Sequence, residues 1–140
     1  MHYPGSEATE EDHRRFDAVA RALEGREDVE LVLAFGSRAR GVARPDSDLD
    51  LAVLADPSVD FLDLAYDLGE ATGVEIHLAD LRQAGYPLLQ ALVRDAVRVY
   101  EGRRHAEAEW RAAALTLVEL DRPGWERMSE GFLDHLAETA

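Results

Sequence analysis

Two short apolar runs, separated by a polar segment, constrain the fold of this chain more than any other feature. Residues 31–35 (LVLAF) and 49–54 (LDLAVL) have the length and composition of buried β-strands. The segment between them begins with Gly36 and Ser37, residue types that end strands and form turns. We therefore expect a strand that ends in a Gly/Ser turn, followed by a second strand.

Two carboxylates, Asp48 and Asp50, open the second strand. Because side chains alternate along a strand, both should leave the sheet on one face while Leu49 and Leu51 face the core. Two like charges so close together repel each other, and Mg²⁺ bound by carboxylates and substrate phosphates would relieve that repulsion. Backbone N–H groups at the Gly36-Ser37 turn could hold the phosphates, so we expect metal and phosphate to meet in one pocket.

The spacing of these residues resembles a known signature. Gly36-Ser37, ten residues, then Asp48-x-Asp50 is similar to the G-S-x10-D-x-D pattern of the polymerase-β-like nucleotidyltransferase superfamily, in particular its minimal nucleotidyltransferases. The neighbouring residues Arg38, Arg40, Gly41 and Ser47 strengthen the resemblance. It implies an α/β (α+β) fold with a small mixed sheet of about four strands, flanking helices and a helical C-terminal tail, and it covers about residues 29–100.

Periodicity predicts the remaining elements of what we expect to be a single nucleotidyltransferase domain, residues 1–140. Helical spacing indicates helices over 9–24, 61–73 and 86–95, and a helical tail over about 104–140. The tail carries two apolar stripes, 110–118 and 125–136, separated by a turn at 121–124. Alternation indicates further strands over 74–78 and 97–100.

The third strand departs from the family pattern. Glu75 and His77 should face the same side as Asp48 and Asp50, and the resemblance places His77 where the family has a third carboxylate. Three outcomes are open at this stage: Glu75 reaches the metal, His77 accepts a proton, or the metal site is weak and the protein binds nucleotide with little transfer. Asp80, further along, is expected to be a helix N-cap.

Composition narrows the class of protein. The 140-residue chain contains no cysteine, which excludes disulfides and thiolate metal sites, and its formal net charge of −14 argues against direct binding of nucleic acid. The sequence shows no membrane span or secretion signal, so we expect a cytoplasmic protein. Three basic residues, Arg38, Arg40 and Arg44, gather in the signature loop, where a triphosphate would lie.

The resemblance also implies an activity. Members of the superfamily transfer a nucleoside monophosphate from a nucleoside triphosphate to a hydroxyl. The resemblance places Mg²⁺ on Asp48 and Asp50, the nucleotide on Gly36, Ser37, Arg38, Arg40 and Ser47, and His77 or Glu75 beside them in catalysis. Minimal members of this length resemble antitoxins, which implies ATP as donor and a tyrosine of a HEPN toxin as acceptor and partner.

Two alternatives stay open. The chain could be an antitoxin that neutralises its partner by binding, with a residual nucleotide site, or an enzyme that modifies a small molecule such as an aminoglycoside. The sequence does not specify the donor base, the acceptor residue, or whether the protein forms homo- or hetero-oligomers.

Overall fold

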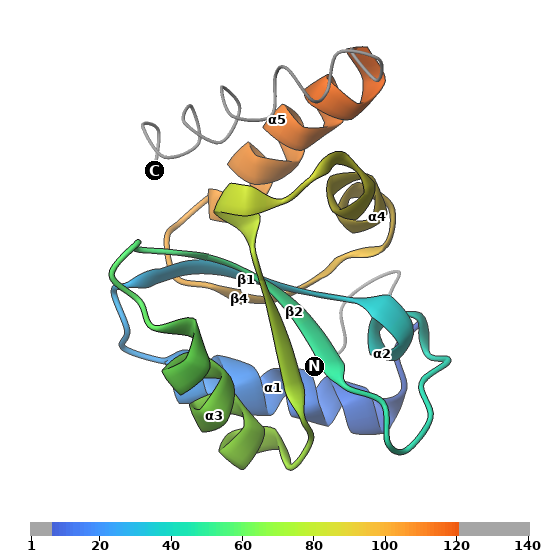
Figure 1. The fold of residues 1–140 in the computed structure, drawn as a ribbon, viewed down its shortest axis with the longest axis vertical. Coiled ribbons are helices and arrows are strands. Elements are labelled where there is room, and N and C mark those ends of the chain that lie inside the picture. Colours follow the sequence, from blue (N-terminus) through green and yellow to red (C-terminus); the bar gives the residue numbers. More distant parts are fainter. Residues whose placement is uncertain (1–6, 121–140) are drawn as a thin grey trace.

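A computed structural model describes residues 7–120 of the chain (Figure 1). A four-stranded sheet in the order β3-β2-β1-β4 forms its centre. The strands are β1 (Val29–Phe35), β2 (Leu49–Ala55), β3 (Ile76–Asp80) and β4 (Val97–Glu101), and the helices are α1 (Glu10–Leu23), α2 (Gly36–Arg40), α3 (Phe61–Thr72), the 3₁₀ turn η1 (Leu81–Gln83), α4 (Tyr86–Asp95) and α5 (Ala106–Leu120).

The sheet is mixed, as the sequence predicted. Strand β1 runs antiparallel to both β2 and β4, whereas β2 and β3 are parallel. The parallel pair requires a crossover, and α3 provides it. In this register Phe35 is opposite Asp50, and Asp50 is in turn opposite His77, so the second carboxylate of the signature lies between two neighbouring strands.

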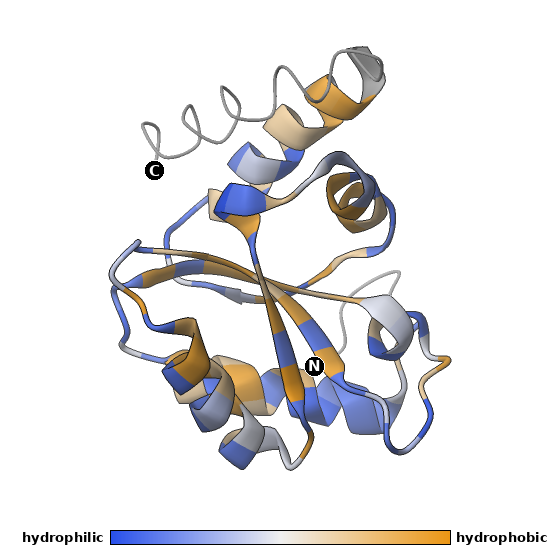
Figure 2. Cartoon of the chain, in the orientation of Figure 1, coloured by the Kyte–Doolittle hydropathy of each residue, from blue (hydrophilic) through white to orange (hydrophobic). Residues whose placement is uncertain are grey.

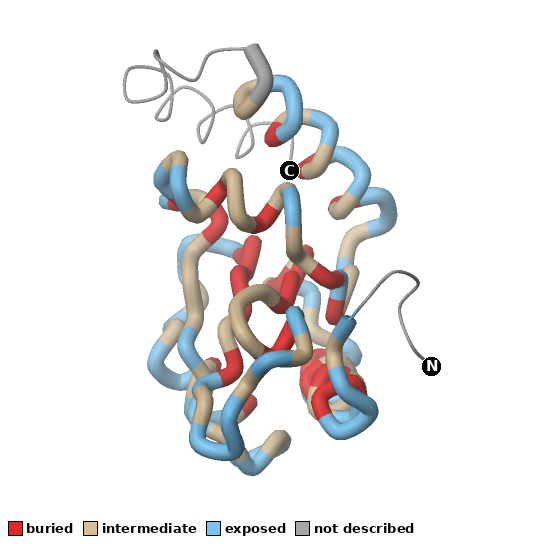
Figure 3. The backbone as a smooth tube through the Cα atoms, turned by 90° about the vertical axis from the view of Figure 1, so that its right-hand side faces the viewer, coloured by how far each residue is buried: buried red, intermediate tan, exposed pale blue. Residues whose placement is uncertain are grey.

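Helices cover both faces of the sheet (Figure 1): α1 and α3 lie on one face, and α4 and α5 lie on the other. Each face has its own apolar core. Val32, Leu51 and Val53 pack with the α1 and α3 side, whereas Leu33 and Ala52 pack with the α4 and α5 side. Buried segments gather at the centre of the molecule, and exposed segments lie along its periphery (Figure 3). From Leu31 onward in β1, and along β2, successive side chains face the two cores in turn, and this alternation fixes which side chains can reach a site outside them.

The N-terminal helix begins as the sequence indicated. The Thr9 side chain accepts a hydrogen bond from the Asp12 backbone N–H, 3.1 Å away, and so satisfies one of the free donors in the first turn. Phe16, Val19 and Leu23 are buried against the sheet, and Gly25 follows with φ +83°. The apolar spacing and the turn residues therefore predicted the helix correctly within one residue at either end.

Several boundaries differ from the predictions. Residues 36–40 form the short helix α2 instead of an open turn, and Gly41, in the left-handed conformation, ends it. Strand β3 begins at Ile76, two residues later than expected, so Glu75 precedes the strand. Asp80 caps the 3₁₀ turn η1 as expected, because its carboxylate accepts a hydrogen bond from the Arg82 N–H at 2.9 Å.

The helical tail is described only in part. Helix α5 begins at Ala106 and buries Trp110 and Ala114 against the sheet, which agrees with the first predicted apolar stripe. The second predicted stripe, 125–136, lies outside the described residues. Within the described range, no helix combines the length and apolar character needed to cross a bilayer.

Candidate functional site

The candidate site lies where β1 ends and β2 begins. Leu49 and Leu51 belong to the core beneath α1 and α3, and Asp50 lies between them on the opposite face of β2. The predicted alternation is therefore confirmed for Asp50 and the two core leucines, whereas Asp48 lies just before the strand. Figure 2 shows mostly hydrophilic residues along the loop that leads from α2 into β2, whereas the strands are mostly hydrophobic. The polar end of the loop and the apolar sheet thus meet at Asp48.

Gly36 lies directly against the Asp50 carboxylate. Its φ is +76°, and a Cβ atom added to it would lie 3.2 Å from Asp50 Cγ and overlap Asp50 Oδ2. An L-residue with a side chain would therefore meet both backbone strain and a steric clash. The glycine of the signature is needed here because it lets the end of β1 approach the carboxylate on β2.

His77 is the partner of Asp50 on the neighbouring strand. Its Nδ1 lies 3.1 Å from Asp50 Oδ1, and the two residues are opposite each other in the parallel register. An ionised carboxylate can only accept, so the Nδ1–H donates and the neutral ring then carries a free lone pair on Nε2. The His77 side chain is 64% exposed and that of Asp50 is 25% exposed, so solvent or a substrate can reach the pair.

Asp48 and Glu75 are both exposed and flank this pair. Asp48 immediately precedes β2, and the Leu49 N–H that follows it donates to the Glu75 carbonyl at 2.9 Å. Among residues 7–120 no three His, Asp or Glu side chains gather closely enough to hold a metal by themselves. Two carboxylates are nevertheless hard oxygen donors of the kind that bind Mg²⁺ together with phosphate oxygens and water. The residues therefore fit a cation shared with a substrate better than a cation held by protein alone.

The basic residues of the loop separate into two groups. Arg38 is buried, and all three of its guanidinium nitrogens donate to protein acceptors: Asp12, Pro45 and Ser47. Its expected contact with phosphate does not fit this arrangement, because the guanidinium already binds the protein. Arg40 and Arg44 are exposed and remain the cations of the loop that a phosphate could reach.

The two serines of the signature are also placed differently. Ser37 lies in α2, and the Ser37 carbonyl accepts the Val42 N–H at 3.0 Å. The Ser47 hydroxyl accepts the Arg44 N–H at 2.9 Å, while the Ser47 N–H donates back to the Arg44 carbonyl at 3.0 Å. Ser47 thus closes a turn just before Asp48. Helix α2 begins without a side-chain cap, so its first backbone N–H groups have no side-chain acceptor.

One residue connected to the site was missed by sequence reasoning. Asp12 lies in the first turn of α1, and its carboxylate accepts a hydrogen bond from Arg38, 26 positions further along the chain. An aspartate in the first turn of a helix is common, so no local signal distinguishes this one. The contact depends on how α1 packs beside α2, which the sequence pattern does not reveal.

The fold and the signature are shared with known proteins. Residues 17–105 match the family described as Polymerase beta, Nucleotidyltransferase. The protein adenylyltransferase MntA of Shewanella oneidensis is 33% identical over 75 residues, which are 51% of this chain and 54% of that protein. The match thus spans about half the length of this curated relative.

Solved structures with similar folds come from toxin–antitoxin complexes. A chain of the toxin-antitoxin with AMP-PNP aligns with a TM-score of 0.63 and 22% identity, over 89% of this chain and 98% of that chain. A chain from the complex of the tri-AMPylated Shewanella oneidensis HEPN toxin with MNT antitoxin gives 0.58 and 21%, over 91% and 98%. At these identities the alignments show a common fold. Since the family match covers more than half of the chain and contains Gly36, Asp50 and His77, this chain belongs to the polymerase beta nucleotidyltransferase family.

Proposed function

We propose that this protein is a Mg²⁺-dependent nucleotidyltransferase that moves AMP from ATP to a hydroxyl of a partner protein, and that this modification makes it an antitoxin. The observation that carries the proposal is the contact between Gly36 and the Asp50 carboxylate at the junction of β1 and β2. It brings a glycine turn, whose backbone N–H groups are suited to phosphate, beside an acid suited to a metal. We propose a tyrosine of a HEPN toxin as the acceptor.

The comparisons support the donor and the partner by similarity. The relative from Shewanella oneidensis is named a protein adenylyltransferase, and one similar structure contains the ATP analogue AMP-PNP. Another contains an AMPylated HEPN toxin together with its antitoxin. Because the relative is matched over only half of its length, we carry its activity and partner to this chain as proposals. The compartment we propose is the cytoplasm, where ATP and Mg²⁺ are available.

Each residue of the site has a proposed task. Asp48 and Asp50 would hold Mg²⁺, which when bound neutralises charge that develops on the transferred phosphoryl group and the leaving oxygen. Backbone N–H groups at Gly36 and Ser37 would bind the outer phosphates. Arg40 is the exposed guanidinium we assign to the triphosphate, because Arg38 is buried and already bonded within the protein.

In the reaction, the acceptor hydroxyl oxygen attacks the α-phosphorus while the bond from that phosphorus to the α,β-bridging oxygen breaks, and pyrophosphate leaves. The hydroxyl must lose its proton to a base within hydrogen-bonding reach. His77 Nε2 is our first candidate, because Nδ1 is already bonded to Asp50 and the ring is exposed. Glu75, exposed and just before β3, is the second.

The direct test is AMP transfer from ATP labelled on the α-phosphate, with Mg²⁺ and the product of the neighbouring gene. We expect labelled partner with the wild type and none with the Asp48→Asn/Asp50→Asn double variant. Asp46→Asn is a matched control, because it removes an exposed acid from the same loop and should leave transfer intact. Transfer that persists in the double variant would refute the proposed site.

A second function rests on one specific observation. Histidine occupies the third acidic position of the family pattern, and no three acidic or histidine side chains among residues 7–120 form a metal site. Both facts favour an antitoxin that acts by covering its partner, with a weak nucleotide site. If the Asp48→Asn/Asp50→Asn variant still neutralises the toxin, this function is supported. If the variant loses both AMP transfer and neutralisation, catalysis is favoured.

A further inference from the structure

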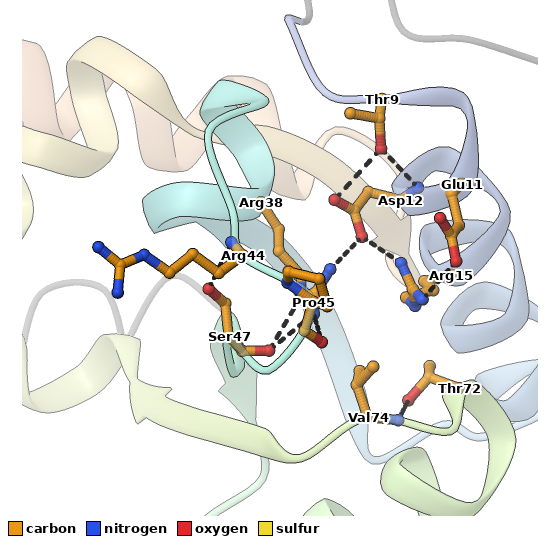
Figure 4. Close-up of polar contacts among 10 residues, drawn as sticks. All are labelled: Thr9, Glu11, Asp12, Arg15, Arg38, Arg44, Pro45, Ser47, Thr72 and Val74. Carbon is orange, nitrogen blue, oxygen red and sulfur yellow. Dashed lines mark hydrogen bonds and ion pairs between the residues drawn. The ribbon is translucent and has the colours of Figure 1, made fainter.

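A buried ion pair connects helix α1 to helix α2, which leads into the loop that precedes the signature acids (Figure 4). Arg38 Nη1 lies 2.9 Å from Asp12 Oδ1, and the side chains are 4% and 3% exposed. Burying two charges costs free energy, and it is tolerated only when the pair is close and its remaining donors and acceptors are bonded. The remaining hydrogen-bond partners of Asp12 and Arg38 therefore indicate the role of the pair.

The rest of the Arg38 guanidinium binds the backbone of the loop. Nε and Nη2 both donate to the Ser47 carbonyl, at 3.1 and 2.8 Å, and Nη2 also reaches the Pro45 carbonyl at 3.3 Å. These carbonyls belong to the residues directly before Asp48. A guanidinium can clamp one carbonyl with two N–H groups and hold a carboxylate at the same time, which an ammonium group cannot do.

Asp12 is itself held in place from two sides. Its Oδ1 accepts a hydrogen bond from Arg15 Nη1 at 2.7 Å, and its Oδ2 accepts one from the Thr9 hydroxyl at 3.3 Å. Helix α1 is anchored further along by Phe16 and Val19, both fully buried in the core. A continuous chain of contacts thus leads from the core through α1 and Asp12 to Arg38, and from Arg38 to the residue before Asp48.

We propose that Asp12 and Arg38 are a positioning pair: they fix the loop 41–48 so that the Asp48 carboxylate is held beside Asp50 and the Gly36 turn. The inference rests on the proposed function of that site. Neither residue touches the reacting atoms, so both act through Asp48. Catalytic groups displaced by about 1 Å can cost on the order of 10²-fold in rate, so a loop anchor can control turnover from a distance.

A purely structural role is the competing explanation, and the chain offers a control for it. Arg15 makes the same kind of contact with Asp12, but its second hydrogen bond, to Glu11 at 2.8 Å, stays within α1. If the network only stabilises α1, Arg15→Gln and Arg38→Lys should have similar effects. If it positions Asp48, only changes at Asp12 and Arg38 should alter the chemistry.

The test compares the wild type, Asp12→Asn, Arg38→Lys, the double variant and Arg15→Gln at a temperature where circular dichroism shows each to be folded. Steady-state AMP transfer gives kcat and the KM for ATP. A second readout that needs no turnover is the affinity for Mn²⁺ by electron paramagnetic resonance, in the presence of the α,β-methylene analogue of ATP. Asp12→Asn keeps the shape of the side chain, so it remains informative if Arg38→Lys fails to fold.

We expect kcat to fall about tenfold in Asp12→Asn and about 30-fold in Arg38→Lys, with the KM for ATP changed less than about threefold. The kcat of the double variant should lie within about twofold of that of Arg38→Lys, because the two residues act as one unit. Mn²⁺ binding should weaken in the same variants, and Arg15→Gln should match the wild type in both readouts.

Two results would overturn the inference: unchanged kcat and Mn²⁺ affinity in folded Asp12→Asn and Arg38→Lys, or equal losses in Arg15→Gln. A wild type without any transfer would instead refute the proposed function, and the Mn²⁺ measurement would still decide whether the pair positions Asp48.

Discussion

Charged side chains are incompletely paired at one end of the central sheet and paired within the protein at the other. At one end, where β1 leads into α2 and β2 begins, Asp48 is exposed and Asp50 has His77 as its bonded side chain. At the other end, where β1 begins and β2 and β4 finish, arginines and acids surround a cavity of about 590 Å³. The difference separates charges that maintain the fold from charges that remain available to a substrate.

At this second end the charges are matched within the protein. Arg26 binds Asp28 through two hydrogen bonds of 2.8 Å, and Arg103 binds both Glu30 and Glu109. The hydrogen bonds from Arg26 hold the pKa of the Asp28 carboxyl below its ordinary value. Hydrogen bonds from Arg103 to Glu109 and Glu30 raise the pKa of that guanidinium in turn. A charged ligand entering the cavity would have to displace these partners.

At the signature end the matching is incomplete. Within residues 7–120 no arginine forms an ion pair with Asp48 or Asp50, although Arg40 and Arg44 belong to the same loop. Acids left without a cation in the protein can accept one from outside. The comparison teaches that a cavity alone is a poor guide to the site in this protein, because the cavity at the second end is lined by charges that are already paired.

Among the single substitutions that test this comparison, the largest effect should come from the histidine beside Asp50. We expect His77→Ala to lower AMP transfer about 10²- to 10³-fold, because it removes both the candidate base and the hydrogen bond that orients the carboxylate. Stability should change by less than about 0.5 kcal/mol, since the contact is exposed. Glu75→Ala is the matched comparison, measured in the same transfer assay. A larger loss in Glu75→Ala than in His77→Ala would reassign the third position to the glutamate.

A smaller loss is expected when the approach of the backbone to Asp50 is blocked. Gly36→Ala should lower transfer about 10²-fold, because the added Cβ pushes the carboxylate away. Gly73→Ala is a control of unusual quality: Gly73 has the same φ of +76° but no atom within 4 Å of an added Cβ. Each variant should lose about 1 kcal/mol of stability from backbone strain, and Gly36→Ala should lose more because of its clash with Asp50. Equal transfer in the two variants would contradict a special role for Gly36.

The smallest effect, a change in stability, is expected at the end of the sheet where Arg26 and Asp28 are paired. Because the pKa of Asp28 is lowered by Arg26, the ionised carboxylate stabilises the folded chain above the ordinary pKa of about 3.9, and this contribution is lost as the pH falls through the lower folded-state value. Asp28→Asn should cost about 0.5 kcal/mol at pH 7, since the pair is partly exposed, and less at pH 3, below the ordinary pKa of the carboxyl.

Urea unfolding at both pH values measures this difference in stability, and AMP transfer at pH 7 should not change. In an Arg26→Gln background, Asp28→Asn should no longer change the free energy of unfolding at either pH. A fall in transfer that exceeds the loss of folded protein would link this end of the sheet to the chemistry and break the distinction between the two ends.

Local pattern was enough to predict the frame of the site. Alternation along residues 49–54 placed Asp50 opposite the core, and the same argument placed His77 on the face of Asp50. Both predictions depend only on the two-residue period of a strand and on strands being neighbours. The start of β3 was placed two residues too early because Val74 packs against the core without joining the strand.

The pattern could not reveal what happens between the strands. Helix α2 has five residues, too few for an apolar period to be visible. The burial of Arg38 depends on α1 and on the carbonyls of Pro45 and Ser47, and neither contact has a signal in the neighbouring sequence. An arginine in a signature loop is therefore read as a ligand for phosphate until the fold shows that its acceptors lie within the protein.

The central claim is that Asp48 and Asp50 serve AMP transfer to a partner. Its most direct test is the intact mass of the proposed partner, a HEPN toxin, purified after co-expression with the wild type or with the Asp48→Asn/Asp50→Asn variant. Our account predicts a partner heavier by one or more adenylyl groups with the wild type and an unmodified partner with the variant. An unmodified partner in both cases, or the same added mass in both, would contradict it.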